Sequence, residues 1–577
     1  MVYIDYETVS EALSDFGYSM HESNELLAKI DSLATEFNLE ADDFVDELLA
    51  SVVNLKKTEV DLTVLEHMET ELMKKLKKNL DGFVPGSSLK SKRNALGECS
   101  VNQLTFNVSC VEAEDLSSED FGSIRLKGSY QAFAPVSNSP SNAKYQTRTE
   151  RFVVTQQHQG QRFVKSSASG GSASIEILSA TPNDKYAVDK TSNVIDAKCE
   201  RMARFAALCC EANPEISEWS TPIAGSTDSL FVYGEIVRNA PGDVPLSDQS
   251  ASLLMNDEAG TVMKLDLSRL PEVTIYPGQL VSFLGSFEGG DRFITSRQFF
   301  PAPLPLAPLK KTLVDENFRM WCASGPFTTT DNCSYEPLCD LLDMVAKEQP
   351  HVLILMGPLV ESKNAFMQRP EFPETYESVM NQLMRNIAKS LEGSRTEVIV
   401  QPAPFRDACC QPIFPTPPFL FSSDVCKKMG KRLHCVSDPC IARLNGIEVA
   451  FTSSEVIMHL SKTEWHSSPE QENRDRITRL NSHILEQRSL YPLLPPAIPS
   501  SLEELMKICN LRAAPHVIIN SSVLAASIKN INGTIFVNPG ITSRGGSGTF
   551  LRSEFSTSLA QNASDLSDCS MFEIVKL

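Results

Sequence analysis

Loops in the C-terminal part of the chain carry the residues whose types and spacing could do chemistry. Each loop follows a short apolar segment, as it does where a buried parallel strand ends at the carboxyl edge of a sheet. At such an edge, a two-metal phosphoester hydrolase holds paired divalent ions with oxygen and imidazole ligands from several strands. The loops of this chain place the following residues there: Gly325, Gly357, Pro358, Glu361, Arg406, Asp407, Asn520 and Ser521.

These residue types match a two-metal site poorly. Pro358 follows the glycine after which such an enzyme has a metal-binding Asp, and proline has no ligand atom. Arg406 and Asp407 stand where an Asn and a His are expected, and Asn520 stands where paired histidines are expected. Glu361 is a lone carboxylate. Without neutral imidazoles and several convergent carboxylates, a divalent pair lacks an adequate cage. The sequence therefore predicts no metal, no cofactor and no catalysis here.

Histidines and glycines elsewhere do not supply the missing groups. The nine histidines include no pair at a ligand-like spacing, and His434, His459 and His516 stand among apolar residues, which favours a hydrogen-bonded core role. The glycine-rich stretch 544–549 lacks the GK[ST] ending and the following helix of a phosphate-binding loop, so we expect an ordinary loop.

A working metallophosphoesterase remains the alternative hypothesis. It would use Glu361, Asp407, Asn520 and scattered histidines. Manganese-dependent phosphodiester hydrolysis that Asp407→Ala abolishes would support it.

The region 301–577 has the alternating pattern of an α/β domain. Helices are expected at 338–347, 376–391, 474–487 and 502–511. Strands are expected between and around them, at 320–323, 352–356, 397–401, 433–436, 447–452, 516–520 and 534–537.

Residues 186–300 are predicted to form a helix followed by a small barrel. Five short strand-like runs within about 75 residues, separated by turns such as Pro277-Gly278, are typical of a closed OB-type barrel. Such barrels bind single strands through aromatic side chains and a basic groove. Cations are sparse near Phe283, Phe287, Phe293 and Phe299, so we expect these rings to form the barrel core.

Two further regions precede the barrel. Residues 1–80 have apolar side chains at helical spacing and are predicted to be a small helical domain for protein docking. Residues 81–185 are rich in Ser, Thr, Asn and Gly, which predicts a flexible linker with short strand-like pieces such as 152–155. Ser139 and Thr181, each followed by proline, are candidate phosphorylation sites.

Composition limits the class of protein. The chain has 577 residues and a net charge of −20, which opposes broad binding to nucleic acid. Residues 1–50 contain thirteen acidic residues and one lysine. The fifteen cysteines form no CxxC motif, and no apolar run is long enough to span a membrane. These features predict a reducing intracellular location, and the lysines between 74 and 92 suggest either nuclear import or a solvated helix end.

Eight segments between about 262 and 552, taken together, resemble one family. They are "LDLSRLPEVTIYPGQLV", "ASGPFTTTDN", "LMGPLVESKN", "PAPFRDACCQPIFPTPPF", "VSDPC", "NGIEVAFTSSEVIMHL", "ILEQRSLYPLLPP" and "IFVNPGITSRGGSGTFLR". Their order and wording are similar to the B, or accessory, subunits of the DNA polymerase alpha–primase complex. Accessory subunits of related replicative polymerases are the nearest alternative, and the first segment together with the "YPLLPP" run favours alpha.

The resemblance implies a multidomain fold: a small helical N-terminal domain, a flexible linker, an OB-type barrel and an inactive calcineurin-like phosphoesterase domain. It also implies a nuclear scaffold for initiation of DNA replication that binds the zinc-containing C-terminal region of the catalytic subunit. Primase would be contacted indirectly, other replication factors would bind residues 1–80, and DNA would be contacted at most indirectly. On this reading, the eight residues at the sheet edge are degenerate positions of a former active site.

Overall fold

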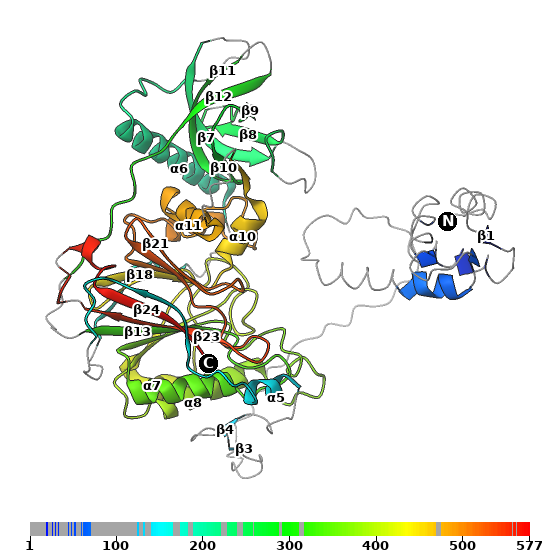
Figure 1. The fold of residues 1–577 in the computed structure, drawn as a ribbon, viewed down its shortest axis with the longest axis vertical. Helices are drawn as coiled ribbons and strands as arrows, with labels where there is room; N and C mark the ends of the chain where they lie inside the picture. Colours follow the sequence, from blue (N-terminus) through cyan, green and yellow to red (C-terminus); the bar gives the residue numbers. More distant parts are fainter. Residues whose placement is uncertain are drawn as a thin grey trace, which may run out of the picture. The chain divides into compact units, whose positions relative to one another are not determined.

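The structure is a computed structural model that describes most of residues 140–577. The gaps lie at 166–172, 183–188, 221–227, 239–245, 258, 288–290, 311–316, 469–474, 557 and 561. Before residue 140, it describes short strands and scattered helical positions. The chain divides into two compact units, Met1–Leu116 and Ser117–Leu577, which we describe separately (Figure 1).

The first unit has a helical apolar core. Residues 62–70 are helical, and a short parallel strand pair joins β1 (Ser19–Met20) to β2 (Glu59–Val60). Most of the described apolar positions at helical spacing are buried, namely Leu26, Ile30, Leu33, Phe44, Leu48, Val52, Leu65 and Met68. Leu62, which was expected in the same apolar stripe as Leu65 and Met68, is instead exposed at the start of its helix. The lysines between 74 and 92, as well as Ser139, lie outside the described residues.

The predicted barrel is confirmed. Its strands close in the order β11-β12-β9-β8-β7, with β9 and β12 parallel and the other neighbours antiparallel. Phe283, Phe287 and Phe293 are buried inside it, as expected for core aromatics. The predicted helix is α6 (Thr191–Ala212), which packs Phe205 against a second apolar cluster with Phe299. The strands are β7 (Leu230–Arg238), β8 (Ala251–Met255), β9 (Val262–Asp266), β11 (Leu280–Ser286) and β12 (Arg292–Phe299).

The C-terminal domain is a sandwich of two mixed sheets. One sheet has the order β16-β15-β14-β13-β23-β24-β5 and the other β21-β22-β20-β18-β17-β6. The first consists of β16 (Leu433–Cys435), β15 (Glu397–Gln401), β14 (Val352–Met356), β13 (Phe318–Ser324), β23 (Thr549–Phe555), β24 (Ser570–Lys576) and β5 (Val154–Gln159). The second consists of β21 (Ser527–Ile531), β22 (Thr534–Asn538), β20 (Val517–Asn520), β18 (Ile447–Thr452), β17 (Cys440–Leu444) and β6 (Ile175–Ile177).

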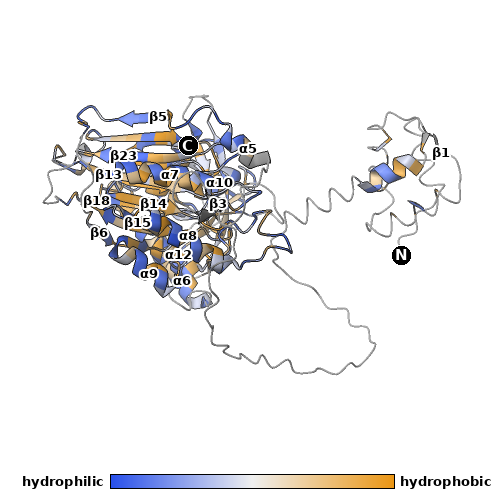
Figure 2. Ribbon diagram, turned by 90° about the horizontal axis from the view of Figure 1, so that it is seen from below, coloured by the Kyte–Doolittle hydropathy of each residue, from blue (hydrophilic) through white to orange (hydrophobic). Residues whose placement is uncertain are grey.

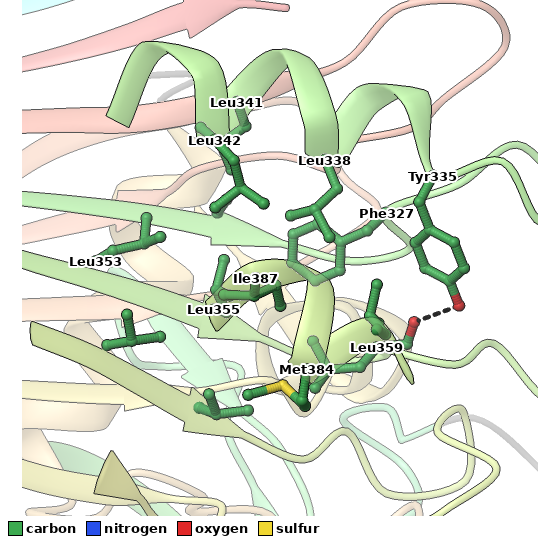
Figure 3. Packing of buried hydrophobic residues seen from close by; sticks show 14 of the residues in the cluster. Phe327, Tyr335, Leu338, Leu341, Leu342, Leu353, Leu355, Leu359, Met384 and Ile387 are labelled. Atoms are coloured by element: carbon green, nitrogen blue, oxygen red, sulfur yellow. Dashed lines mark hydrogen bonds between the residues drawn. The ribbon is translucent and has the colours of Figure 1, made fainter. Parts of the chain in front are cut away.

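Helices cover the outer faces, which gives four layers. Alternate residues of β14 point to opposite faces: Ile354 lies in the core between the sheets, whereas Leu353 and Leu355 pack beneath α7 (Glu336–Glu348) and α8 (Tyr376–Ser390). Figure 3 shows this outer cluster, with Leu338 and Ile387 among its members. The other outer face is covered by α10 (Val456–Thr463), α11 (Arg476–Glu486) and α12 (Leu502–Ile508).

The structure shows ordered elements in the second half of the range 81–185, for which the sequence predicted a flexible linker with short strand-like pieces. Within that range, α5 (Pro140–Gln146) is a helix whose Tyr145 donates a hydrogen bond to Asp340 at 2.9 Å. Strand β5 pairs with β24, and β6 pairs with β17, so this stretch adds an edge strand to each sheet. The strand-like piece 152–155 overlaps the start of β5, but the polar residues that follow gave no strand signal, because the pairing of β5 depends on backbone hydrogen bonds to a distant strand. Thr181 is exposed, four residues after β6.

The barrel and the sandwich share a packed junction. Strand β10 (Val273–Ile275) pairs antiparallel with β19 (Trp465–Ser467). Tyr276, which follows β10, is buried in the core under α11, and its ring contacts His483 at 4.9 Å. The Gln487 amide accepts from the Leu280 N–H at 2.8 Å and donates to the Leu280 carbonyl at 2.9 Å. These contacts join the barrel to the sandwich within the second compact unit.

No helix in the described part of the chain is long and apolar enough to cross a membrane.

Candidate functional site

The loops that the sequence singled out meet at one end of the sandwich. Strands β13, β14 and β15 run parallel in one sheet, and β18 and β20 run parallel in the other. Contacts bridge the two sheets there: the Ser324 and Ser521 hydroxyls hydrogen-bond to each other, and the Gln401 amide donates to the Phe451 carbonyl at 3.1 Å. The expectation that the strand ends share one edge is confirmed.

Two glycines allow the backbones at this edge to approach closely. A Cβ on Gly325 would lie 2.0 Å from the Pro358 carbonyl oxygen. A Cβ on Gly357 would lie 2.6 Å from the Ala403 nitrogen and 2.6 Å from a carboxylate oxygen of Asp407. The space after each strand is therefore filled by protein atoms.

Asp407 accepts hydrogen bonds from backbone groups of the neighbouring loop. Its carboxylate accepts from the Leu359 N–H at 2.9 Å and from the Val360 N–H at 3.2 Å, and the residue is 5% exposed. Burial raises the pKa of Asp407 to about 7, although the N–H donors favour the charged form. The carboxylate thus fixes the loop that follows β14. Tyr335 fixes the same loop by donating to the Leu359 carbonyl at 3.0 Å, the dashed contact in Figure 3.

Glu361 faces an arginine. The Arg406 guanidinium donates to Glu361 at 3.0 Å and lies 3.9 Å from a carboxylate oxygen of Glu455. Glu455 comes from the other sheet, just after β18, and accepts from the Ser522 hydroxyl at 2.6 Å and the Val523 N–H at 3.0 Å. One cationic side chain therefore lies between carboxylates of both sheets. Backbone pairing also places Glu361 opposite Asp407.

Asn520 and Ser521 turn toward protein groups. The Asn520 amide donates to Asn481 of α11 at 3.2 Å, and its carbonyl oxygen has no hydrogen-bond partner among the described residues. The Ser521 hydroxyl forms a hydrogen bond with the Ser324 hydroxyl. The structure thus brings the predicted residues to one edge but gives them mostly internal partners.

Asp438 and Glu455 belong to this edge and were not singled out as site residues. Asp438 is fully buried and accepts from Thr452 at 2.7 Å and Ser454 at 2.8 Å. Burial raises the pKa of Asp438 to about 6, partly offset by these donors. The local signals in the sequence are an Asp before proline at Asp438 and the hydroxyl run 452–454 before Glu455, and neither reveals which strands meet.

The three histidines predicted to have core roles each have a hydrogen bond. His459 contacts the Tyr491 hydroxyl at 3.0 Å, His516 accepts from the Glu448 N–H at 3.0 Å, and His434 lies 3.1 Å from Glu397. Burial lowers the pKa of His459 and of His516 to about 4. His459 and His516 are therefore neutral at physiological pH, and none of the three lies with other ligand residues in a cluster.

The described residues contain no group of three or more His, Cys, Asp or Glu side chains arranged to hold a metal ion. The edge carboxylates instead pair with Arg406 or accept hydrogen bonds from backbone N–H and hydroxyl groups. The arrangement can hold loops and sheets together.

The chain belongs to the class of multidomain proteins that join an OB-type barrel to a helix-covered α/β sandwich, and comparison with known proteins identifies the family. Residues 320–529 match the family of the DNA polymerase alpha/epsilon B subunit. Residues 7–75 match the N-terminal family of the DNA polymerase alpha B subunit, and residues 192–300 match the family of its OB domain.

Whole-length relatives agree. The DNA polymerase alpha B subunit of Caenorhabditis elegans is 34% identical over 586 residues, covering 99% of this chain and 99% of the relative. The Mus musculus and Rattus norvegicus proteins of the same name are 28% and 27% identical and cover 95% of each chain. The chain belongs to the family of DNA polymerase alpha B subunits.

Proposed function

We propose that this chain is a non-catalytic scaffold that binds the C-terminal, zinc-containing region of the polymerase alpha catalytic subunit and supports initiation of DNA replication in the nucleus. Primase would be contacted through that partner, and residues 1–80 would dock other replication factors. Its sandwich would be a calcineurin-like phosphoesterase fold that has lost its chemistry. The family assignment supports the partner, and the sheet edge supports the loss of catalysis.

One observation carries the non-catalytic part of this proposal. At the edge where a two-metal enzyme binds its ions, Asp407 accepts from two backbone N–H groups and Glu361 is paired with Arg406. A divalent ion would have to displace a guanidinium and break loop-fixing hydrogen bonds before it gained two carboxylates. Hydrolysis therefore lacks its metal-activated nucleophile.

The two-sheet architecture supports the proposed origin. Parallel strands in each sheet deliver their loops to one common edge, and Gly325 and Gly357 follow two of those strands as they would in a hydrolase. The degenerate positions are then Gly325, Gly357, Pro358, Glu361, Arg406, Asp407, Asn520 and Ser521.

Co-purification tests the scaffold role. The full chain, co-expressed with the C-terminal region of the catalytic subunit, should elute with it as one complex in size-exclusion chromatography. Well-folded preparations of both that elute separately would refute the proposal.

A hydrolysis assay separately tests the non-catalytic role. The full chain with Mn²⁺ and bis(p-nitrophenyl) phosphate should release no more nitrophenol than buffer does. Manganese-dependent turnover that Asp407→Ala abolishes would instead establish the alternative, an active phosphoesterase.

Phosphorylation of Ser139 and Thr181 remains a prediction. The exposure of Thr181 leaves its hydroxyl accessible to a kinase.

A further inference from the structure

A cluster of cations lies where three helical segments end on the outer face of the sandwich. Helix α8 carries Lys389 in its last turn, and the segment after the helix includes Arg395. Helix α9 (Ser423–Met429) carries Lys427 and Lys428 in its last turn, and η1 (Gly430–Arg432) follows directly with Lys431. All five side chains are exposed. Helices α8 and α9, both labelled in Figure 2, pack side by side. Leu420 precedes α9 and therefore lies toward the end of the helix opposite to its cationic last turn. We call the five cations together with Leu420 the α8–α9 basic surface.

The surface is built on a fixed framework. Arg432 donates to the carbonyls of Leu391 and Ser394, both at 2.9 Å, which joins η1 to the segment after α8. Val425 and Met429 anchor α9 in the core beneath. The exposed cations therefore keep a defined spacing and are not carried on a free loop.

Most of these cations have no acidic partner. Lys428 lies 3.5 Å from Asp424, whereas Lys389, Arg395, Lys427 and Lys431 form no ion pair within the part of the chain that the structure describes. Residues 389–395 and 423–432 together contain six Lys or Arg and two Asp or Glu, in a chain whose net charge is −20. A local excess of positive charge on an acidic protein is a site of attraction for a negative partner.

Helix-end electrostatics explains only part of this arrangement. Cations in the last turn complement the helix macrodipole, which is sufficient for a few solvated lysines. It does not explain Leu420, which is 98% exposed three residues before α9. Phe419 and Phe421 flank it, stack at 5.6 Å and pack against the core, so Leu420 is held outward on an anchored loop.

We propose that the α8–α9 basic surface docks an acidic protein segment that also offers an apolar contact to Leu420. The cations would pair with carboxylates of the segment, and the leucine would supply the buried apolar contact that gives such interfaces their affinity. A nucleic-acid backbone would use the cations and leave Leu420 in water, so an acidic polypeptide fits the whole surface better. This inference does not depend on the proposed scaffold role.

Fluorescence anisotropy with two labelled probes tests the proposal on the full chain. One probe is a 20-residue peptide of Asp and Glu with two leucines, and the other is a 20-nucleotide oligothymidine. The variants are Lys427→Glu combined with Lys431→Glu, and Leu420→Ser. Lys462→Glu, which changes an exposed last-turn lysine of α10, is the matched control.

The peptide should bind the wild-type chain, and the double charge reversal should weaken it at least about tenfold. Leu420→Ser should weaken it about threefold or more, and the control should leave it unchanged. The proposal is overturned if the peptide does not bind, if the double variant binds it as well as wild type does, or if oligothymidine binds at this surface and the peptide does not. Equal loss with Lys462→Glu would also overturn it, because the effect would then be one of overall charge.

Discussion

The sheet edge and the α8–α9 basic surface differ in whether their charged side chains are paired and buried. At the edge, Glu361 and Asp407 are matched by an arginine or by backbone donors and are largely hidden from water. On the α8–α9 surface, cations such as Lys427 and Lys431 are exposed and have no acidic partner in the described structure. A matched, buried charge contributes to rigidity, because breaking it leaves an uncompensated group. An unmatched, exposed charge contributes little to stability and remains available to a partner.

The largest expected effect comes from Asp407→Ala, which removes the acceptor of the Leu359 and Val360 N–H groups. We expect a loss of about 3 kcal/mol in the free energy of unfolding, because two buried donors are left without partners. Urea denaturation followed by circular dichroism measures it. A loss below about 1 kcal/mol would mean that water or a rearranged loop satisfies these donors.

The same carboxyl group should make stability depend on pH. Burial raises the pKa of Asp407 to about 7 in the folded chain, whereas an unfolded Asp titrates near 3.8. Between these values the folded state binds the extra proton, so the contribution of Asp407 to stability falls as pH rises from about 4 to 7.

Comparison with Asp407→Asn, which cannot titrate, isolates this contribution. The unfolding free energy of wild type minus that of Asp407→Asn should decrease across this range and level off above it. A difference that increases with pH would show that the N–H donors outweigh burial and that the folded pKa is low.

Arg406→Ala should have a smaller effect. This substitution removes the guanidinium that lies between the carboxylates of Glu361 and Glu455. We expect a loss of about 1–2 kcal/mol in the free energy of unfolding, because the three side chains are partly exposed. Arg406→Lys should recover part of it, since a lysine keeps the charge but cannot bridge both carboxylates with a planar fork. If Arg406→Ala is as stable as wild type, the ion cluster does not hold the two sheets together.

The smallest effect is expected at the α8–α9 surface. Lys427→Glu combined with Lys431→Glu should lower the unfolding free energy by less than about 1 kcal/mol, because neither side chain has an ion-pair partner and only the interaction with the helix macrodipole is lost. Thermal unfolding at the same protein concentration is the measurement. A large loss in the free energy of unfolding would show that these lysines stabilise the fold, as the edge residues do. The two regions would then not differ in the role of their charges.

Part of the edge could be predicted from the chain alone. The apolar run 352–356 is followed by Gly357 and Pro358. The sequence therefore predicted both the end of a buried strand and the lack of a metal-binding Asp at that position. The role of Asp407 was not predicted, because its partners lie 47 and 48 residues away in another loop. Glu455 and Asp438 were missed for the same reason.

By itself, the sequence determined the local elements and the groups absent from the strand ends, because apolar periodicity and residue type act over a few positions. Strand β14 and helix α8 follow from such patterns. Only the tertiary structure decided that β5 and β6 complete the two sheets, since polar β5 becomes a strand only through hydrogen bonds to β24. It also decided which charges are matched: the guanidinium of Arg406 meets Glu455 only where two sheets fold against each other.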